Sequence, residues 1–142
     1  MTDYQYLKNY QNDEELMESY FNLTQKVFSF DLKKWRSAGY WKDKYIPHSI
    51  ILDNEVVANI SASIMQVQIN EKDIPAVQLG SVCVLSEHRG KGLSKILMER
   101  VFEEYKKYPL IFLFASDDVS EFYEKFGFRQ YDNYSALEIK RL

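Results

Sequence analysis

A short polar loop, Arg89-Gly90-Lys91-Gly92, separates an apolar stretch from a long amphipathic one. The apolar stretch ends at Val82-Cys83-Val84-Leu85 and predicts a strand, whereas the segment that begins at Leu93 predicts a helix. The first backbone N–H groups of a helix have no acceptor within the helix, and they attract anions such as phosphate. Glycine lets an anion approach the backbone closely, and Arg89 and Lys91 add positive charge. The loop therefore indicates a binding place for a phosphorylated cofactor.

The same residues also have simpler explanations. The glycines alone would suit a tight turn that caps a helix, and Arg89 and Lys91 could be solvated surface charges. Cys83, beside the loop, could suggest an acyl-enzyme. However, neither histidine, His48 nor His88, stands at a spacing that would activate it. We therefore interpret Cys83 as a small buried apolar residue, and we assign no special role to the histidines.

An antiparallel meander is predicted ahead of the loop. Asn12-Asp13-Glu14-Glu15 is a good helix start, and Asp31 can cap a second, shorter helix. Pro47 marks a break, and tight turns are expected at Asp53-Asn54 and over residues 70–73. The predicted elements are helices from about Asn12 to Phe28 and from Asp31 to Gly39, and strands over 49–52, 56–69 and 74–85.

The pattern changes after the loop. A helix from Leu93 should end near Tyr108-Pro109, and Leu110–Phe114 is an uninterrupted apolar run typical of a buried parallel strand. The strand to residue 85, the helix and this run predict a βαβ crossover. A capping box at Asp118 begins a helix that Gly127 stops, and a last hairpin spans about 128–139. The fold class is α/β (α+β), with a mixed central sheet.

Composition limits the function further. The 142 residues predict one domain over 1–142, and a net charge of −3 with a pI near 5.4 argues against nucleic acid as a partner. One cysteine and two histidines are a poor ligand set, so we expect no metal. We see no signal peptide and no apolar run near the roughly 20 residues that span a bilayer. The expectation is a cytoplasmic protein that binds no membrane.

Two motifs resemble those of the GCN5-related N-acetyltransferase (GNAT) superfamily. The family's cofactor motif, Arg/Gln-x-x-Gly-x-Gly/Ala, fits the segment from Arg89 to Ser94, except that Ser94 replaces glycine or alanine. The second motif is Tyr-x-x-x-Gly-Phe, which is present from Tyr123 to Phe128. The order of predicted elements agrees along nearly the whole chain. The two motifs flank the apolar run 110–114, and together they are far more specific than either one alone.

The resemblance implies that acetyl-CoA binds where the strands ending at Leu85 and Phe114 splay apart. The pantetheine arm would pair with backbone groups of Val82, Cys83 and Val84, and a backbone N–H there would polarise the acetyl carbonyl. Tyr123 would donate a proton to the departing thiolate. Ser116 replaces an asparagine that contacts the cofactor in many members. The implied pyrophosphate seat comprises the segment Arg89, Gly90, Lys91, Gly92, Leu93 and Ser94.

The resemblance thus implies an acetyl-CoA-dependent N-acetyltransferase that acts by direct transfer on a primary amine of a small molecule or peptide. The alternative is a non-catalytic module that binds or senses acyl-CoA on the same fold. A P-loop protein is disfavoured because Gly-x-x-x-x-Gly-Lys-[Ser/Thr] is absent. No carboxylate is indicated as general base, and a homodimer stays open. The predicted acceptor wall, residues 28–47, is aromatic and of mixed charge, with Trp35, Tyr40, Trp41 and Tyr45.

Overall fold

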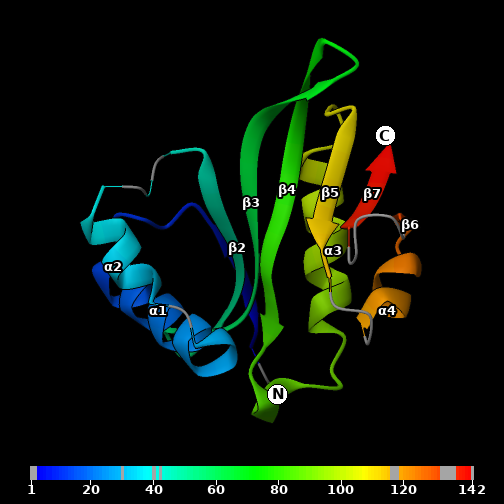
Figure 1. The fold of residues 1–142 in the computed structure, drawn as a ribbon. Coiled ribbons are helices and arrows are strands. Elements are labelled where there is room, and N and C mark those ends of the chain that lie inside the picture. Colours follow the sequence, from blue (N-terminus) through cyan, green and yellow to red (C-terminus); the bar gives the residue numbers. More distant parts are fainter. Residues whose placement is uncertain are drawn as a thin grey trace.

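The chain forms a seven-stranded mixed sheet in the order β1-β2-β3-β4-β5-β7-β6 (Figure 1). A computed structural model describes residues 3–29, 31–39, 41, 43–115, 119–131 and 137–141. Every neighbouring pair of strands is antiparallel except β4 and β5, which run parallel. The mixed sheet, the antiparallel meander and the βαβ unit predicted from the sequence are thereby confirmed.

The first half of the chain carries two helices and the meander. Asp13 caps the first helix by accepting a hydrogen bond from the Leu16 N–H, and Asp31 caps the second in the same way through Lys34. The short edge strand β1 was not predicted from the sequence. The elements are β1 (Gln5–Lys8), α1 (Glu14–Phe28), α2 (Leu32–Ser37), β2 (Tyr45–Leu52), β3 (Glu55–Ile69) and β4 (Lys72–Val84).

Two predicted boundaries in the meander were wrong. Pro47 is no break but lies inside β2, opposite Ser61. Its carbonyl accepts the Asn9 N–H just past the end of β1, so the missing proline N–H falls where the neighbouring strand has stopped. The second turn comprises only Asn70 and Glu71, with φ of 50° and 66°. Such a two-residue turn matches the twist of the strands, and β4 therefore begins at Lys72 rather than at Ile74.

The second half builds the βαβ unit and a closing hairpin. The apolar run predicted as a buried strand is β5, with the predicted bounds. The last predicted helix begins at Ser120, with Val119 at its N-cap, and Asp118 lies outside the described residues. The elements are the 3₁₀ turn η1 (Ser86–His88), α3 (Leu93–Glu104), β5 (Leu110–Phe114), α4 (Ser120–Glu124), β6 (Arg129–Tyr131) and β7 (Leu137–Arg141).

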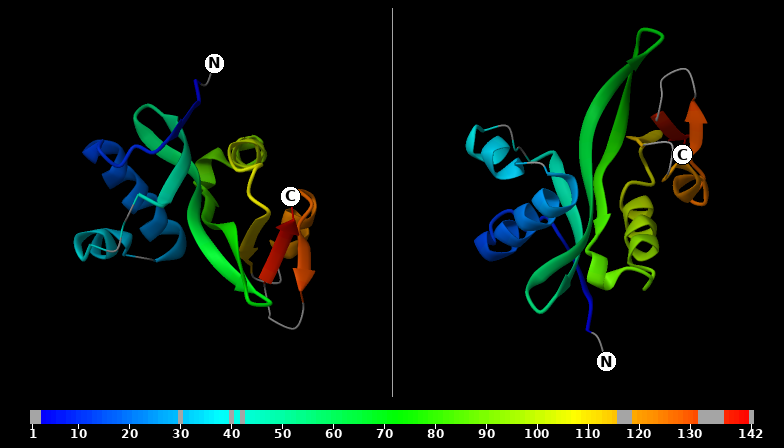
Figure 2. Two further views of the ribbon diagram at one scale, coloured as in Figure 1. Left: turned by 90° about the horizontal axis from the view of Figure 1, so that it is seen from above. Right: turned by 60° about the horizontal axis from the view of Figure 1, so that its bottom comes forward.

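The helices α1 and α3 lie on opposite faces of the central strands (Figure 2). Apolar side chains from both helices meet the sheet, and Met17, Tyr20, Ile60, Leu97 and Met98 are among those fully buried there. None of the helices in the described ranges is long and apolar enough to cross a membrane. The core therefore fixes β3 and β4 from both sides, and these strands carry the site.

His48, to which we assigned no special role, is fully buried within this core. Its two ring nitrogens lie 2.7 Å from the hydroxyls of Tyr6 and Tyr105. Burial lowers the pKa of His48 to about 4, so the ring is neutral at physiological pH. The histidine thus links β1, β2 and the end of α3, which is a structural role.

The parallel strands β4 and β5 stay together for only part of their length. They pair from Ala76 opposite Leu110 to Leu79 opposite Leu113. Beyond Leu79, β4 follows β3 as far as Val84, while β5 ends at Phe114 (Figure 1). Ligands of open α/β sheets bind at the carboxyl ends of strands that diverge in this way. The predicted splayed central strands are therefore present, and they mark the candidate site.

Candidate functional site

The glycine loop leads from η1 into α3, as the sequence predicted. Gly90 and Gly92 have φ of 77° and 76°, which glycine adopts without strain. Gly92 is the N-cap of α3 and supplies no side chain to satisfy the first helical N–H groups. A Cβ built on either glycine meets nothing within 4 Å. The loop therefore exposes backbone donors to open space, which is an arrangement that fits a phosphate or pyrophosphate.

The two cationic side chains of the loop behave differently. Arg89 turns back, and its Nε donates to the Val84 carbonyl at 3.2 Å, which ties the loop to the end of β4. Lys91 is exposed, and its Nζ lies 5.9 Å from the centre of the Tyr4 ring. Both Leu93 and Ser94 belong to the first turn of α3, where Leu93 is buried and Ser94 is half-buried. Arg89 thus has a structural contact besides any contact with an anion.

A β-bulge interrupts β4 beside the point where β4 and β5 diverge. Asn59 lies opposite Cys83 and Ser61 lies opposite Gly80, so two residues of β4 face the single residue between them. One of these two, Ser81, has a φ of 48°, which is rare for a residue other than glycine. A bulge releases backbone groups from the ladder and re-aims side chains. It therefore changes the course of β4 just past the last pair that β4 makes with β5.

Tyr123 lies in a cavity between the diverging strands. This donor-side cavity has a volume of about 310 Å³, and the Tyr123 side chain is 8% exposed. Tyr123 packs edge-on against Phe122 and Phe128, with ring centres 5.2 and 6.0 Å apart. Ser116 lies outside the described residues. The cavity is lined by Phe28, Leu79, Gly80, Ser81, Val82, Leu113, Phe114, Ala115, Val119 and Tyr123.

Cys83 does not face this cavity as a reactive thiol. It is 8% exposed, and its sulfur lies 3.5 Å from the Ser81 carbonyl oxygen. Burial raises the pKa of the Cys83 thiol to about 12, so almost none of it is thiolate near neutral pH. The position and the pKa agree with a packing role, and they argue against an acyl-enzyme.

A second cavity is also lined by residues at the bulge. This acceptor-side cavity has a volume of about 650 Å³ and is lined by Ser29, Asp31, Leu32, Trp35, Tyr45, Gly80 and Ser81. It shares Gly80 and Ser81 with the donor-side cavity. Trp35 and Tyr45, which the sequence placed in an acceptor wall, both line it. The residues that bring the two cavities together are thus the bulge and its neighbour in β4.

A buried chain of hydrogen bonds, which was not predicted from the sequence, supports the bulge. The Asn59 amide donates to the Ser81 carbonyl at 3.1 Å and to the Ser61 hydroxyl at 2.9 Å. The Tyr20 hydroxyl lies 2.9 Å from both Ser61 and Tyr45, and Tyr45 lies 3.4 Å from the Ser81 hydroxyl. Polar residues at alternating positions of β3 could have indicated a polar layer, but not its partners on α1 and β2.

No group of three or more His, Cys, Asp or Glu side chains that could hold a metal occurs in the described part of the chain.

Taken together, the site comprises the glycine loop with its free helix N-terminus, a donor-side cavity with a tyrosine and an acceptor-side cavity with a carboxylate. This combination can hold a phosphorylated donor molecule and bring a second molecule to it at Ser81.

Comparison with known proteins identifies one family and several solved structures with the same fold. The model of the acetyltransferase (GNAT) domain family matches residues 9–131. A Saccharomyces cerevisiae protein, glycylpeptide N-tetradecanoyltransferase, is 30% identical over 87 residues, which are 61% of this chain and 18% of that protein. The chain therefore spans less than a fifth of the length of this relative.

Solved structures share the fold at low identity. A probable N-acyltransferase from Enterococcus faecalis aligns with a TM-score of 0.76 at 20% identity, covering 91% of this chain and 33% of that one. A GNAT family acetyltransferase from Brucella melitensis, solved with acetyl-CoA, aligns with a TM-score of 0.70 at 17% identity. That alignment covers 100% of this chain and 90% of the other.

Proposed function

We propose that this chain, which belongs to the acetyltransferase (GNAT) domain family, transfers an acetyl group from acetyl-CoA directly to a primary amine. The observation that carries the proposal is the meeting of two cavities at Gly80 and Ser81, with Tyr123 in one and a carboxylate, Asp31, in the other. Direct transfer needs donor and acceptor to meet at one point, and the bulge provides such a point. The Brucella melitensis relative was solved with acetyl-CoA, which supports the choice of donor.

The residues of the loop and of β4 fit the donor. We assign the pyrophosphate to the backbone N–H groups of residues 90–94, with Arg89 and Lys91 nearby. We assign the extended arm of acetyl-CoA to the backbone of Val82, Cys83 and Val84, past the last pair that β4 makes with β5. The donor-side cavity then receives the thioester. Acetyl-CoA supplies the activated acyl group, and the chain supplies position and hydrogen bonds.

The reaction forms one bond and breaks one. The amine nitrogen bonds to the acetyl carbonyl carbon, and the carbon–sulfur bond breaks. A backbone N–H at the bulge stabilises the carbonyl oxygen as it gains charge, and Tyr123 donates its phenol proton to the leaving sulfur. The amine loses its proton to water, and Tyr123 regains a proton from water after the thiol has left. Cys83 forms no covalent intermediate, because it is buried and protonated.

The rate of thiol release from acetyl-CoA tests this function. We expect release to depend on an added primary amine and to yield an equal amount of acetylated amine by mass spectrometry. Acetyl-CoA binding without amine-dependent release would instead favour a module that binds acyl-CoA and does not catalyse. The peptide acceptor in the name of the yeast relative makes a short peptide a useful member of the amine panel.

A further inference from the structure

We propose that the acceptor-side cavity is specific for a small primary amine whose carbon chain carries an aromatic ring or a comparable apolar group. This inference rests on the proposed function and deepens it, since it names the class of acceptor. The apolar group would lie against Leu32, Trp35 and Tyr45, and Asp31 would attract the ammonium into the cavity.

The apolar wall is incomplete without a ligand. Helix α2 buries none of its side chains, and Leu32 and Trp35, three residues apart, lie on the same face of the helix, toward the cavity. The ring of Trp35 stands at 76° to that of Tyr45, with centres 5.2 Å apart. Both rings are half-buried and line the cavity, so part of their apolar surface stays exposed there. An apolar ligand group would cover that surface and gain the contacts that the chain itself does not make.

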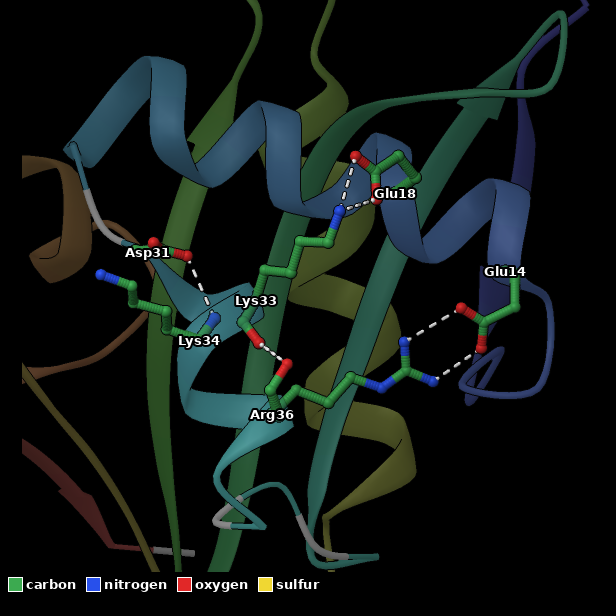
Figure 3. A network of polar contacts seen from close by, with 7 residues as sticks. Glu14, Glu18, Asp31, Lys33, Lys34 and Arg36 are labelled. Atoms are coloured by element: carbon green, nitrogen blue, oxygen red, sulfur yellow. Dashed lines mark hydrogen bonds and ion pairs between the residues drawn. The ribbon is translucent and has the colours of Figure 1, made fainter.

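The charge of the lining residues favours a cationic ligand. Asp31 is the one carboxylate among the residues that line this cavity in the described ranges, and no lysine or arginine lines it. Two nearby cations of α2 turn toward α1 (Figure 3). Lys33 pairs with Glu18 at 2.9 Å, and Arg36 pairs with Glu14 at 3.0 Å. Among the lining residues in the described ranges, the charge that an incoming cation meets is therefore the negative charge of Asp31.

The same two features exclude other acceptors. A single exposed carboxylate can pair with only one of the several ammonium groups of a polycation. A wholly polar amine would make no apolar contacts with Leu32, Trp35 and Tyr45. A cavity of about 650 Å³ is within the size range of small-molecule sites. The ligand that fits this cavity thus has one ammonium group and one apolar group, joined by a short carbon chain.

A matched pair of amines tests the class. Both 4-phenylbutylamine and butylamine carry their nitrogen on an unbranched four-carbon chain, and only the former has a phenyl ring at the other end. The ring is too far from the nitrogen to change its pKa much, so the two amines have similar pKa values. We expect kcat/KM to be at least about tenfold higher for 4-phenylbutylamine, chiefly through a lower KM. Spermidine should be acetylated more slowly than 4-phenylbutylamine. Equal values for the matched pair, or a preference for spermidine, would overturn the inference.

Substitutions at two residues separate the contributions of ring and charge. Trp35→Ala should lower kcat/KM for 4-phenylbutylamine about tenfold more than for butylamine, whereas Trp35→Phe should keep most of the preference. Asp31→Asn retains a good helix cap for α2 but removes the charge. It should raise KM for both amines about two- to fivefold. A uniform loss for both amines in Trp35→Ala would contradict the apolar wall.

Calorimetry of amine binding keeps this inference distinct from the proposed function. If the chain binds 4-phenylbutylamine more tightly than butylamine in the presence of CoA, and Trp35→Ala removes the difference, the acceptor class stands even where no transfer occurs. If transfer occurs but binding shows no preference for the aromatic amine, the proposed function stands and the acceptor class is wrong.

Discussion

Replacing Gly92 with valine should separate cofactor binding from folding. Gly92 has a φ of 76°, and a Cβ built there meets nothing within 4 Å. The side chain therefore fits sterically, and the cost to the folded state is the strain of a left-handed conformation, about 1–2 kcal/mol. For a domain of this size that strain lowers the melting temperature by about 3–8 °C. We expect a variant that folds and melts cooperatively.

The effect on the cofactor should be larger. The open space in front of Gly92 is where we place the pyrophosphate, and a valine side chain would occupy it. Loss of one hydrogen bond to a charged group costs about 1.5–3 kcal/mol. We therefore expect the Kd for acetyl-CoA to rise about 10- to 150-fold.

Gly39→Val is a matched control for this measurement. Gly39 has a φ of 86°, and its Cβ position is likewise open, but it follows α2 and is distant in sequence from the loop. Calorimetry with acetyl-CoA should show weaker binding only in Gly92→Val, while both variants lose similar stability. An unchanged Kd in Gly92→Val, or an equal loss in both variants, would refute the assignment of the loop.

Three further substitutions test the chemistry and the core. Tyr123→Phe should lower kcat about a hundredfold or more and leave the Kd of acetyl-CoA nearly unchanged, since the ring remains to fill its place; undiminished turnover in steady-state kinetics would show that water protonates the thiolate. Cys83→Ala should retain turnover, and intact-mass spectra of the native chain with acetyl-CoA should reveal no acetylated Cys83; an acyl-enzyme would contradict direct transfer. The pKa of His48 is about 4 in the folded chain and 6.5 in the unfolded chain. Between these pH values the unfolded chain binds a proton that the folded chain does not. The free energy of unfolding should therefore fall by about 3 kcal/mol as the pH drops from 6.5 to 4. His48→Gln should flatten that part of the pH profile in urea unfolding, and an identical slope in both proteins would refute the assignment.

Elements with a strong local pattern could be predicted from the sequence. The apolar run Leu110–Phe114 predicted β5 with its bounds, because five apolar residues between turn signals suit a strand buried on both faces. The helix start at Asn12-Asp13-Glu14-Glu15 and the cap Asp31 were predicted for the same reason, since a cap depends only on its own helix. Pro47 misled because its tolerance inside β2 depends on where β1 ends, and that is a property of the sheet rather than of the local sequence.

The candidate site divides in the same way. The glycine loop could be found because a glycine-rich turn between a predicted strand and a predicted helix is visible in the local sequence, and the Tyr123–Phe128 motif made its interpretation specific. The bulge at Ser81 could not, since it follows from the register of β3 against β4 and from the amide of Asn59. The position of Asp31 at the acceptor-side cavity could not be predicted either, because this cavity is lined by residues that are distant in the sequence.

A crystal structure with CoA and an acetylated amine would show directly whether donor and acceptor meet at Ser81. We expect the pyrophosphate at residues 90–94 and the CoA sulfur in the donor-side cavity beside Tyr123. We expect the acetylated nitrogen beside Ser81, in the acceptor-side cavity. CoA bound elsewhere on the sheet, or an acetylated nitrogen distant from Ser81, would contradict direct transfer at this point.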